Sequence, residues 1–244
     1  MKVIVIIPAA GLGTRMTGAG KRAAPSKQFT EIGGVSILVH TVRKFVAVPL
    51  VTELCVALRK PEMAHTEERL KKESGGKRLR VVEGGEHRQE SVANALATIQ
   101  AAPDDIVLVH DAVRPFVDPD IIGNVIQAAQ KYGAAIAGLP AVDTVKQVER
   151  TAEGAIITST IPRARVVMAQ TPQGFRYQVI KKAFDEALAD GFTGTDEASL
   201  VERSGHDVAV VMGSPRNIKI TTPADMELAE IFMSRDARAK ALTG

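Results

Sequence analysis

Strand-like and helix-like segments alternate along most of this chain. Apolar runs typical of buried strands lie at 3–7, 51–58, 79–82, 106–109, 134–139 and 208–211, with shorter ones at 166–169 and 218–220. Helices are expected at 37–45, 61–72, 86–99, 119–132, 177–189 and 223–233, with Ser36 and Asp118 as N-caps and Gly133 as a stop. The alternation predicts an α/β fold, a doubly wound and mostly parallel sheet with helices on both faces. Ligands in such folds bind beyond the carboxyl ends of the strands.

The alternation breaks between residues 142 and 175. Residues 145–148 and 156–158 alternate apolar and polar side chains around a turn at 152–154. This pattern predicts a hairpin that is wet on at least one face. A hairpin of this size is marginally stable alone and needs a surface to pack on. It either pads the main sheet or projects from it as an arm.

Composition narrows the class of protein. The 244 residues allow one large domain or two small ones, and we expect a single domain, 1–244, that carries residues 142–175 as an arm. A net charge of +3 gives no case for nucleic-acid binding and suits a small anionic substrate better. The single cysteine, Cys55, lies in an apolar run, so neither a disulfide framework nor a metal cluster is expected. Without a secretion signal or an apolar run of ~18 residues, we expect a cytoplasmic protein that does not enter a membrane.

The first apolar run opens into a glycine-rich, cationic loop. The sequence PAAGLGTRM begins at Pro8, and more basic residues follow up to Lys27. Gly11 and Gly13 lack a Cβ, so backbone N–H groups can approach phosphate oxygens, while Arg15 can direct two donors at one phosphate. The loop lacks the G-K-[ST] of a P-loop and the third glycine of the dinucleotide fingerprint. We favour a polyphosphate-binding loop over a structural turn, because a turn would span about two to six residues.

Two polar clusters follow expected strands. In GGEHRQES, residues 84–91, backbone amides with Arg88 and Ser91 can read a base edge, although a Gly-Gly turn before a solvated helix fits equally well. In HDAVRP, Asp111 stands at a strand tip, where a nucleotide-bound Mg²⁺ ion is often held. Asp111 and Arg114 can instead form a local ion pair, but the position at a strand end favours function.

Later clusters give weaker signals. Thr144, Arg163 and Thr171 can bind a phosphate monoester, yet ordinary polar hairpin residues are the simpler interpretation. The sequence TDE at 195–197 is more typical of a helix N-cap with acidic residues in the first turn. Lys219 lies in a short apolar run and therefore needs an anionic partner. No histidine pair has metal-ligand spacing and no nucleophile–histidine arrangement stands out, so cationic, Mg²⁺-assisted chemistry is expected.

These motifs occur in a fixed order over nearly the whole chain. They are PAAGxGxRM at 8–16, PxKQ[FY] at 25–29, GGxxRxxSV at 84–92, HDAxRP at 110–115, DT[VM]K at 143–146, TPQ at 171–173, TDEAS at 195–199 and NIK[IV]T at 217–221. The combination resembles the 2-C-methyl-D-erythritol 4-phosphate cytidylyltransferase family of the non-mevalonate isoprenoid pathway. The resemblance implies a Rossmann-like nucleotidyltransferase fold of glycosyltransferase A type. It also implies a homodimer whose projecting β-arms reach into the partner's site.

The resemblance assigns a role to each matching residue. The catalytic cations would be Arg15, Lys27, Arg163 and Lys219. The residues around CTP would be Pro8, Ala9, Ala10, Gly11, Gly13, Gly85, Glu86, Arg88, Ser91, Asp111 and Ala112. Arg114, Thr144, Thr171 and Lys219 would bind the second substrate, and Asp111 would hold Mg²⁺. Three departures are a longer first loop, Glu86, which stands where some members carry Asp, and Arg216, which stands where an acid is common in the family.

The implied reaction transfers a cytidylyl group from CTP to 2-C-methyl-D-erythritol 4-phosphate and releases pyrophosphate. The attacking phosphate is already ionised at neutral pH, so the main barrier is electrostatic, and cations with Mg²⁺ offset it. Cytidylyl transfer to ribitol phosphate or another sugar phosphate is the alternative, because such enzymes share much of the motif set. A non-enzymatic nucleotide-binding module is disfavoured, since binding alone would not need so many cations.

Overall fold

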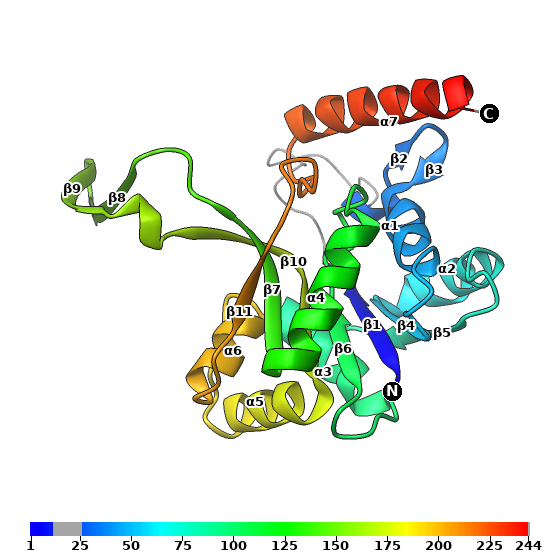
Figure 1. The fold of residues 1–244 in the computed structure, drawn as a ribbon, viewed down its shortest axis with the longest axis horizontal. Coiled ribbons are helices and arrows are strands. Elements are labelled where there is room, and N and C mark those ends of the chain that lie inside the picture. The colour runs from blue at the N-terminus through cyan, green and yellow to red at the C-terminus, as the bar shows by residue number, and fades with distance from the viewer. Residues whose placement is uncertain (12–25, 244) are drawn as a thin grey trace.

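A seven-stranded sheet forms the centre of the computed structural model, which describes residues 1–11 and 26–243 (Figure 1). In spatial order its strands are β11 (Ala209–Met212), β7 (Ala134–Pro140), β10 (Val167–Arg176), β6 (Ile106–Val109), β1 (Val3–Pro8), β4 (Glu53–Leu58) and β5 (Arg78–Glu83). Neighbouring strands run parallel except at β10, which is antiparallel to β6 and β7. The expected doubly wound, mostly parallel sheet is confirmed. Gly13 and Arg15 lie outside the described residues.

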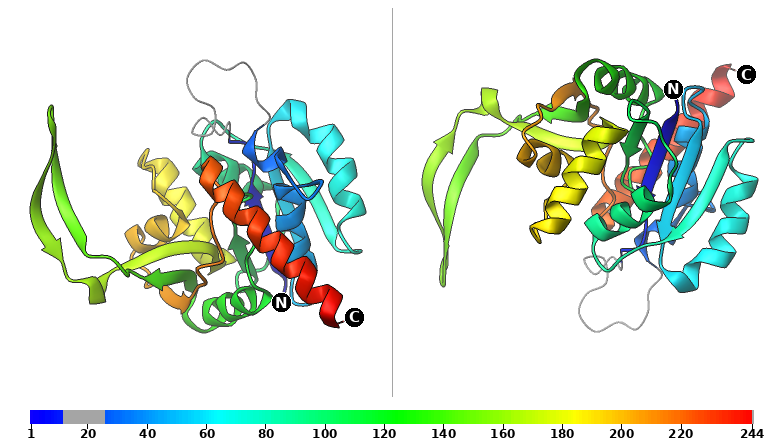
Figure 2. Two further views of the ribbon diagram at one scale, coloured as in Figure 1. Left: turned by 90° about the horizontal axis from the view of Figure 1, so that it is seen from above. Right: turned by 90° about the horizontal axis from the view of Figure 1, so that it is seen from below.

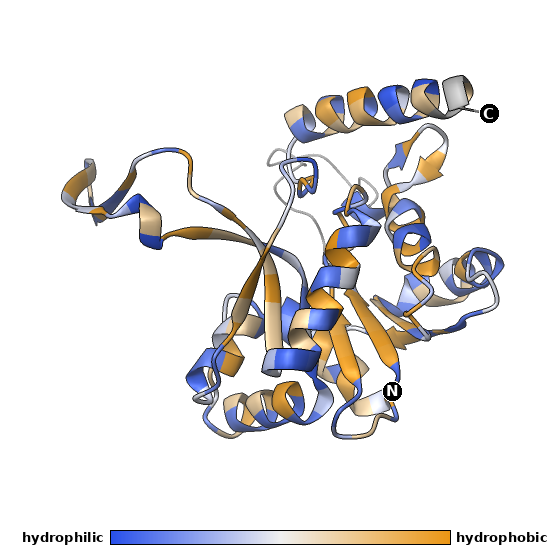
Figure 3. Cartoon of the chain, viewed as in Figure 1, coloured by the Kyte–Doolittle hydropathy of each residue, from blue (hydrophilic) through white to orange (hydrophobic). Residues whose placement is uncertain are grey.

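Both faces of the sheet are covered by helices (Figure 2). On one face lie α1 (Ile37–Val46), α2 (Lys60–Lys72) and α4 (Pro119–Tyr132), and on the other lie α3 (Arg88–Thr98), α5 (Tyr177–Ala189) and α6 (Glu197–Arg203). Successive side chains of a strand point to opposite faces. Val3, Val5 and Ile7 therefore join the first core, whereas Ile4 and Ile6 join the second. Figure 3 shows the resulting apolar strands enclosed between helices with polar outer surfaces.

Local sequence signals account for the ends of several elements. Ser36 Oγ accepts the Val39 N–H at the start of α1, and Asp118 caps α4 in the same manner. Gly133 ends α4 with a φ of 91°, a conformation that favours glycine. Cys55 is fully buried in the second core, and burial raises the pKa of its thiol to about 11. The interpretation of Cys55 as a packing residue is confirmed.

Two expected elements differ from the structure. Residues 218–220 do not form a strand, because none of the described strands pairs with them. Instead, Ile220 N donates to Val113 O, and the Ile220 side chain packs under α7 (Pro223–Thr243). The segment at 166–169 continues to Arg176 as β10, which enters the main sheet. Pro172 hid this strand from sequence analysis, since proline rarely occurs inside a sheet. A register shift between Ala169 and Gln173 accommodates it.

The interruption at 142–175 contains an arm that leaves the body of the molecule (Figures 1 and 2). Strands β8 (Val145–Thr151) and β9 (Gly154–Ile161) pair as the expected hairpin, and η2 (Arg163–Arg165), a single 3₁₀ turn, leads back to β10. Almost every residue of the two strands is exposed. The hairpin therefore projects, and of the two arrangements left open it adopts the arm.

Several smaller elements and the last helix lie outside the seven-stranded sheet. A short ribbon of β2 (Glu31–Ile32) and β3 (Val35–Ser36), which the sequence pattern did not reveal, follows the 3₁₀ turn η1 (Lys27–Phe29). Helix α7 extends well beyond the expected end at residue 233 and packs against this ribbon. None of the helices in the described ranges is both long enough and apolar enough to cross a membrane.

Candidate active site

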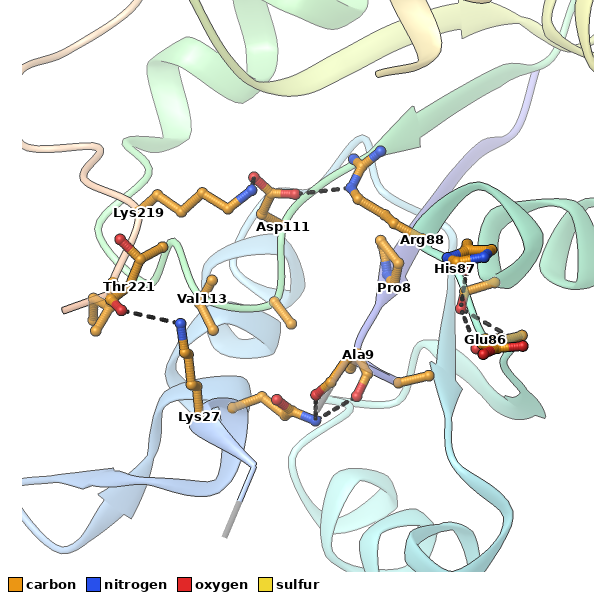
Figure 4. A pocket seen from close by; sticks show the side chains of 17 residues that line it. Pro8, Ala9, Lys27, Glu86, His87, Arg88, Asp111, Val113, Lys219 and Thr221 are labelled. Carbon is orange, nitrogen blue, oxygen red and sulfur yellow. Dashed lines mark hydrogen bonds and ion pairs between the residues drawn. The ribbon is translucent and has the colours of Figure 1, made fainter. Parts of the chain in front are cut away.

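A cavity of about 190 Å³ opens beyond the carboxyl ends of β1 and β6 (Figure 4). Its walls come from five separated stretches: the end of β1, η1, the start of α3, the turn after β6 and residues 219–221. Of the residues expected around CTP, those that line it are Pro8, Ala9, Ala10, Gly11, Gly85, Glu86, Arg88, Ser91, Asp111 and Ala112. Motifs spread over more than a hundred residues therefore meet in one place, at the sheet edge that the fold class predicts.

Gln28 fastens the base of the first loop. Its Nε2 donates to Ala9 O at 2.5 Å and to Gly11 O at 3.4 Å, although 17 or more residues separate the partners in sequence. The glutamine thereby ties the end of β1 to η1, across the segment 12–25. Sequence reasoning overlooked this residue, although its place beside Lys27 in the PSKQF motif was a signal.

Lys27 is fixed in the wall of the cavity. The sequence placed Lys27 at the end of the cationic loop, but Lys27 belongs to η1 and is only 8% exposed. Its Nζ donates to Thr221 O at 3.0 Å, as Figure 4 shows. The correction has a physical reason: the 3₁₀ turn is packed between α1 and the segment after residue 217, which screens the long side chain from solvent. The ammonium group is thus held in place before any ligand arrives.

Ser91 organises the turn before α3. Its Oγ accepts the Gly85 N–H at 3.1 Å and lies 3.1 Å from His87 O, to which it donates. A Cβ on Gly84 would stand 2.5 Å from the Cβ of Ala10, so the close approach of this turn to β1 requires glycine. The Gly-Gly turn is confirmed and also forms a wall of the cavity, while the reading of a base edge by this cluster stays a prediction.

Helix α3 begins two residues later than expected, at Arg88. The carboxylate of Glu90 accepts the backbone N–H groups of Glu86 at 2.8 Å and His87 at 3.1 Å. These bonds satisfy donors at the helix start and keep Glu86 outside the helix. Glu86 consequently faces the cavity from the turn.

Asp111 is the anchor of a buried charge network. Arg88 Nε lies 3.2 Å from Oδ1, and Arg114 Nε and Lys219 Nζ lie 3.2 and 3.0 Å from Oδ2. Arg88 also bonds Glu197 at 2.7 Å. Burial would raise the pKa of Asp111, but Arg88, Lys219 and Arg114 outweigh it and hold that pKa well below its usual range. The local ion pair between Asp111 and Arg114 is therefore present, and the functional role of this strand-end position stays a prediction.

A second cavity of about 210 Å³ adjoins the first and shares Arg88, Asp111 and Lys219 with it. Arg114 and Thr171, both expected to bind the second substrate, contribute to its wall. The structure thus places two compartments on either side of one cluster of cations. Such an arrangement suits two anionic reactants that must meet.

Thr144 and Arg163 lie apart from these cavities, on the exposed arm. Within the ranges that the structure describes, neither residue lines the first or the second cavity. Arg163 Nη1 donates to Val142 O at 2.6 Å at the root of the hairpin. One chain therefore does not bring these two expected site residues to the other members of the set.

The acidic sequence at 195–197 is a helix cap. Asp196 Oδ1 accepts the Ser199 N–H at 2.9 Å, which confirms the favoured interpretation. Asp196 Oδ2 also accepts from Gln173 Nε2 at 2.7 Å, while Glu197 reaches Arg88. Gln173 and Glu197 support the site without having been identified from sequence, because their partners are distant along the chain.

The donors available for Mg²⁺ are few. Among the residues described by the structure, no group of three or more His, Cys, Asp or Glu side chains is placed to hold a metal ion. Asp111 supplies one carboxylate to the cavity, and three cations already share it. Mg²⁺ commonly binds proteins through one or two carboxylates together with substrate phosphates and water. Asp111 fits that mode only if phosphate oxygens provide most of the ligands.

Comparison with known proteins agrees with this geometry. The family model for IspD, 2-C-methyl-D-erythritol 4-phosphate cytidylyltransferase, matches residues 3–235. The enzyme of that name from Acidobacterium capsulatum is 57% identical over 96% of this chain and 98% of its own length, and that from Solibacter usitatus is 53% identical over 100% of both. The crystal structure of the Francisella tularensis enzyme superposes with a TM-score of 0.77 at 36% identity, covering 94% of this chain and 98% of that one. The chain belongs to the 2-C-methyl-D-erythritol 4-phosphate cytidylyltransferase family.

Proposed function

We propose that this enzyme transfers the cytidylyl group of CTP to 2-C-methyl-D-erythritol 4-phosphate, giving 4-diphosphocytidyl-2-C-methyl-D-erythritol and pyrophosphate. The observation that carries the proposal is the pair of adjoining cavities that share Arg88, Asp111 and Lys219. CTP occupies the cavity beside β1, and the acceptor occupies the cavity beside β10. Ribitol phosphate is disfavoured as the acceptor, because the family match spans nearly the whole chain.

The geometry supports catalysis by charge rather than by proton transfer. The attacking phosphate is mostly ionised at neutral pH, since its second pKa is about 6. It must approach the α-phosphorus of CTP against electrostatic repulsion. Lys27 and Lys219 both line the nucleotide cavity, and Lys219 also lines the acceptor cavity. Cations fixed before binding stabilise the charge that builds up during the transfer.

We further propose that Mg²⁺ accompanies CTP, beside Asp111. The support is the donor chemistry of the site, where the carboxylate of Asp111 lines the cavity assigned to CTP. When bound, Mg²⁺ supplies charge neutralisation to the triphosphate and to the departing pyrophosphate. Arg88, Arg114 and Lys219 keep Asp111 ionised and oriented.

A homodimer completes the proposal. Val148 and Ile157 pair across the hairpin and share one face, and they are 46% and 60% exposed, an apolar surface that a second arm would cover. In a two-fold symmetric dimer, each arm would make the same contact with the other chain. Thr144 and Arg163 of one chain would then lie at the acceptor cavity of the other. We place this dimer in the cytoplasm, where CTP is available to it.

Pyrophosphate release tests the proposed reaction. The purified enzyme is given each of the four nucleoside triphosphates, with 2-C-methyl-D-erythritol 4-phosphate, with ribitol phosphate or with no acceptor. We expect release only with the first acceptor and a strong preference for CTP over UTP, because backbone groups near Ala10 and Gly85 can read the base. Equal rates with ribitol phosphate would assign the enzyme to the alternative reaction, and release without any acceptor would contradict both.

A further inference from the structure

A fully buried imidazole lies behind the acceptor cavity. His110 directly follows β6, has no exposed surface and packs its ring against the edge of Phe45 at 4.8 Å between centroids. Its Nε2 lies 3.1 Å from Arg114 O, and its Nδ1 lies 3.0 Å from Thr171 Oγ1. In the described part of the chain, His110 lines neither substrate cavity. It therefore touches the site through Thr171 and Arg114.

The partners of His110 determine which ring nitrogen carries the hydrogen. The carbonyl of Arg114 can only accept, so Nε2 must donate to it. A neutral imidazole then has Nδ1 as an acceptor, and the hydroxyl of Thr171 must donate to that atom. The ring is fully buried, and its two nitrogens face a carbonyl and a hydroxyl rather than a carboxylate, so burial favours the neutral form.

The hydroxyl of Thr171 has a second fixed partner. The backbone N–H of Asp111 donates to Thr171 Oγ1 at 3.1 Å. A hydroxyl has one hydrogen and two lone pairs, so one lone pair remains after these two bonds. Thr171 lines the acceptor cavity, so this last lone pair is the one that its hydroxyl has left for a ligand.

We propose that His110 is a positioning residue that fixes the hydroxyl of Thr171 as an acceptor toward the second substrate. Thr171 then accepts a hydrogen bond from a hydroxyl of the polyol. It cannot donate to a phosphate oxygen without breaking its bond to His110. The inference rests on the proposed function and refines it. Thr171 selects for an alcohol donor on the acceptor, and the phosphate group binds to other residues.

Nitrogen NMR of the unmodified enzyme reads the tautomer directly. The chain contains five histidines, and labelling them with ¹⁵N gives one pair of ring signals for each. Replacing Thr171 by Val removes the donor to Nδ1 and so identifies the signals of His110. We expect a protonated Nε2 and an unprotonated Nδ1, with CTP absent or present. A protonated Nδ1 at pH 7.5 would overturn the proposal, whether or not any acceptor is turned over.

Kinetics test whether the effect passes through Thr171. His110→Gln keeps a donor for the Arg114 carbonyl but loses the acceptor for Thr171, and we expect the KM for the acceptor to rise about tenfold with the KM for CTP unchanged. In a Thr171→Val background the same change should have little further effect, while Thr171→Ser, the matched control, should stay near the parent. An equal rise in both backgrounds, or a parallel rise in the KM for CTP, would show that His110 acts only on the fold.

Fluorinated acceptors separate the two directions of the hydrogen bond. Fluorine can accept weakly but cannot donate. The proposal concerns the hydroxyl of the acceptor that contacts Thr171. An analogue with fluorine at this position should have its KM raised about as much as the deoxy analogue, which carries hydrogen there. A fluorinated acceptor that keeps its KM where the deoxy compound loses it would mean that Thr171 donates, which contradicts the proposal. If no analogue or parent compound is turned over, the proposed function fails and the NMR result still decides the role of His110.

Discussion

The edge of the sheet and the arm differ in how many of their side chains find partners within one chain. At the sheet edge, Asp111 is buried and bonded to three cations, and Lys27 is nearly covered. On the arm, Ile156 and Ile157 face solvent, and Arg163 bonds a backbone carbonyl at the root of the hairpin. In the proposed dimer, one chain preassembles the nucleotide side of the site, and the arm of the partner chain completes the acceptor side.

This difference has an energetic basis. Buried charges are costly unless partners surround them, so the cluster around Asp111 must form as the sheet forms. A two-stranded hairpin without a packed face is marginal in water. In the proposed dimer the arm would therefore gain most of its stability on association, whereas the sheet edge gains its stability on folding.

The largest expected effect comes from removing the fixed cation of the nucleotide cavity. Lys27→Ala should lower kcat about a hundredfold or more, because a preorganised donor at the reacting group is lost. Lys72→Ala is the matched control, since Lys72 forms an exposed ion pair on α2 and should leave kcat unchanged. The measurement is steady-state pyrophosphate release, with circular dichroism to confirm the fold. Activity of the Lys27 variant within a few fold of the parent would remove the role assigned to it.

Asp111→Asn tests whether the sheet edge is held together by one carboxylate. Three cations would lose their shared partner, so the free energy of unfolding should fall by about 3 kcal/mol and kcat should fall as well. Urea titration measures the first quantity. Mg²⁺ titration separates two roles: if Asp111 mainly orients Arg88, Arg114 and Lys219, extra Mg²⁺ will not restore kcat. Recovery at high Mg²⁺ would instead make Asp111 chiefly a metal ligand.

The features that the sequence predicted correctly depend on local patterns, whereas those that it did not predict depend on distant contacts. Buried strands such as β1 and β6 show in the sequence because their apolar runs are local, and the motifs at strand ends met in one cavity because parallel strands share an edge. Glu197 was missed because its partner Arg88 is 109 residues away. A hairpin pattern fixes the pairing of β8 with β9, but it carries no information about which surface the hairpin covers.

The strand expected at 218–220 was wrong for a related reason. An apolar triplet has the pattern of a strand, but a strand also needs a neighbour with free backbone groups. Ile220 meets Val113 through one backbone bond and otherwise packs beneath α7. Lys219 does have the anionic partner expected from its place in an apolar run, and that partner is Asp111.

On the arm, a charge should break association while sparing the body. Ile157→Asp places a carboxylate on the apolar surface that Val148 and Ile157 share and should weaken the dimer about thirtyfold, the effect of losing a central contact worth about 2 kcal/mol. Leu188→Asp is the matched control, because Leu188 is 82% exposed on α5, away from the arm. Sedimentation at several concentrations measures the result. A dimer as tight as the parent would exclude the arm as its interface.

Thiol labelling gives the smallest and most local readout. Cys55 should remain unmodified in the folded enzyme, because it is buried and its pKa is raised to about 11. Ser159→Cys adds an exposed thiol on the arm. We expect that thiol to react several times more slowly at high protein concentration than at low, because the partner covers it. A rate independent of concentration would place residue 159 outside the interface.

Mixing two inactive variants tests the central claim, that one site is built from two chains. Lys27→Ala removes a cation of the sheet edge, and Arg163→Ala removes one of the arm. In a dimer that carries one chain of each kind, one site then keeps both cations and the other has neither. Random exchange should restore about a quarter of the parent activity, since half of the dimers are mixed and each has one intact site. No recovery, with subunit exchange confirmed independently, would contradict a shared site.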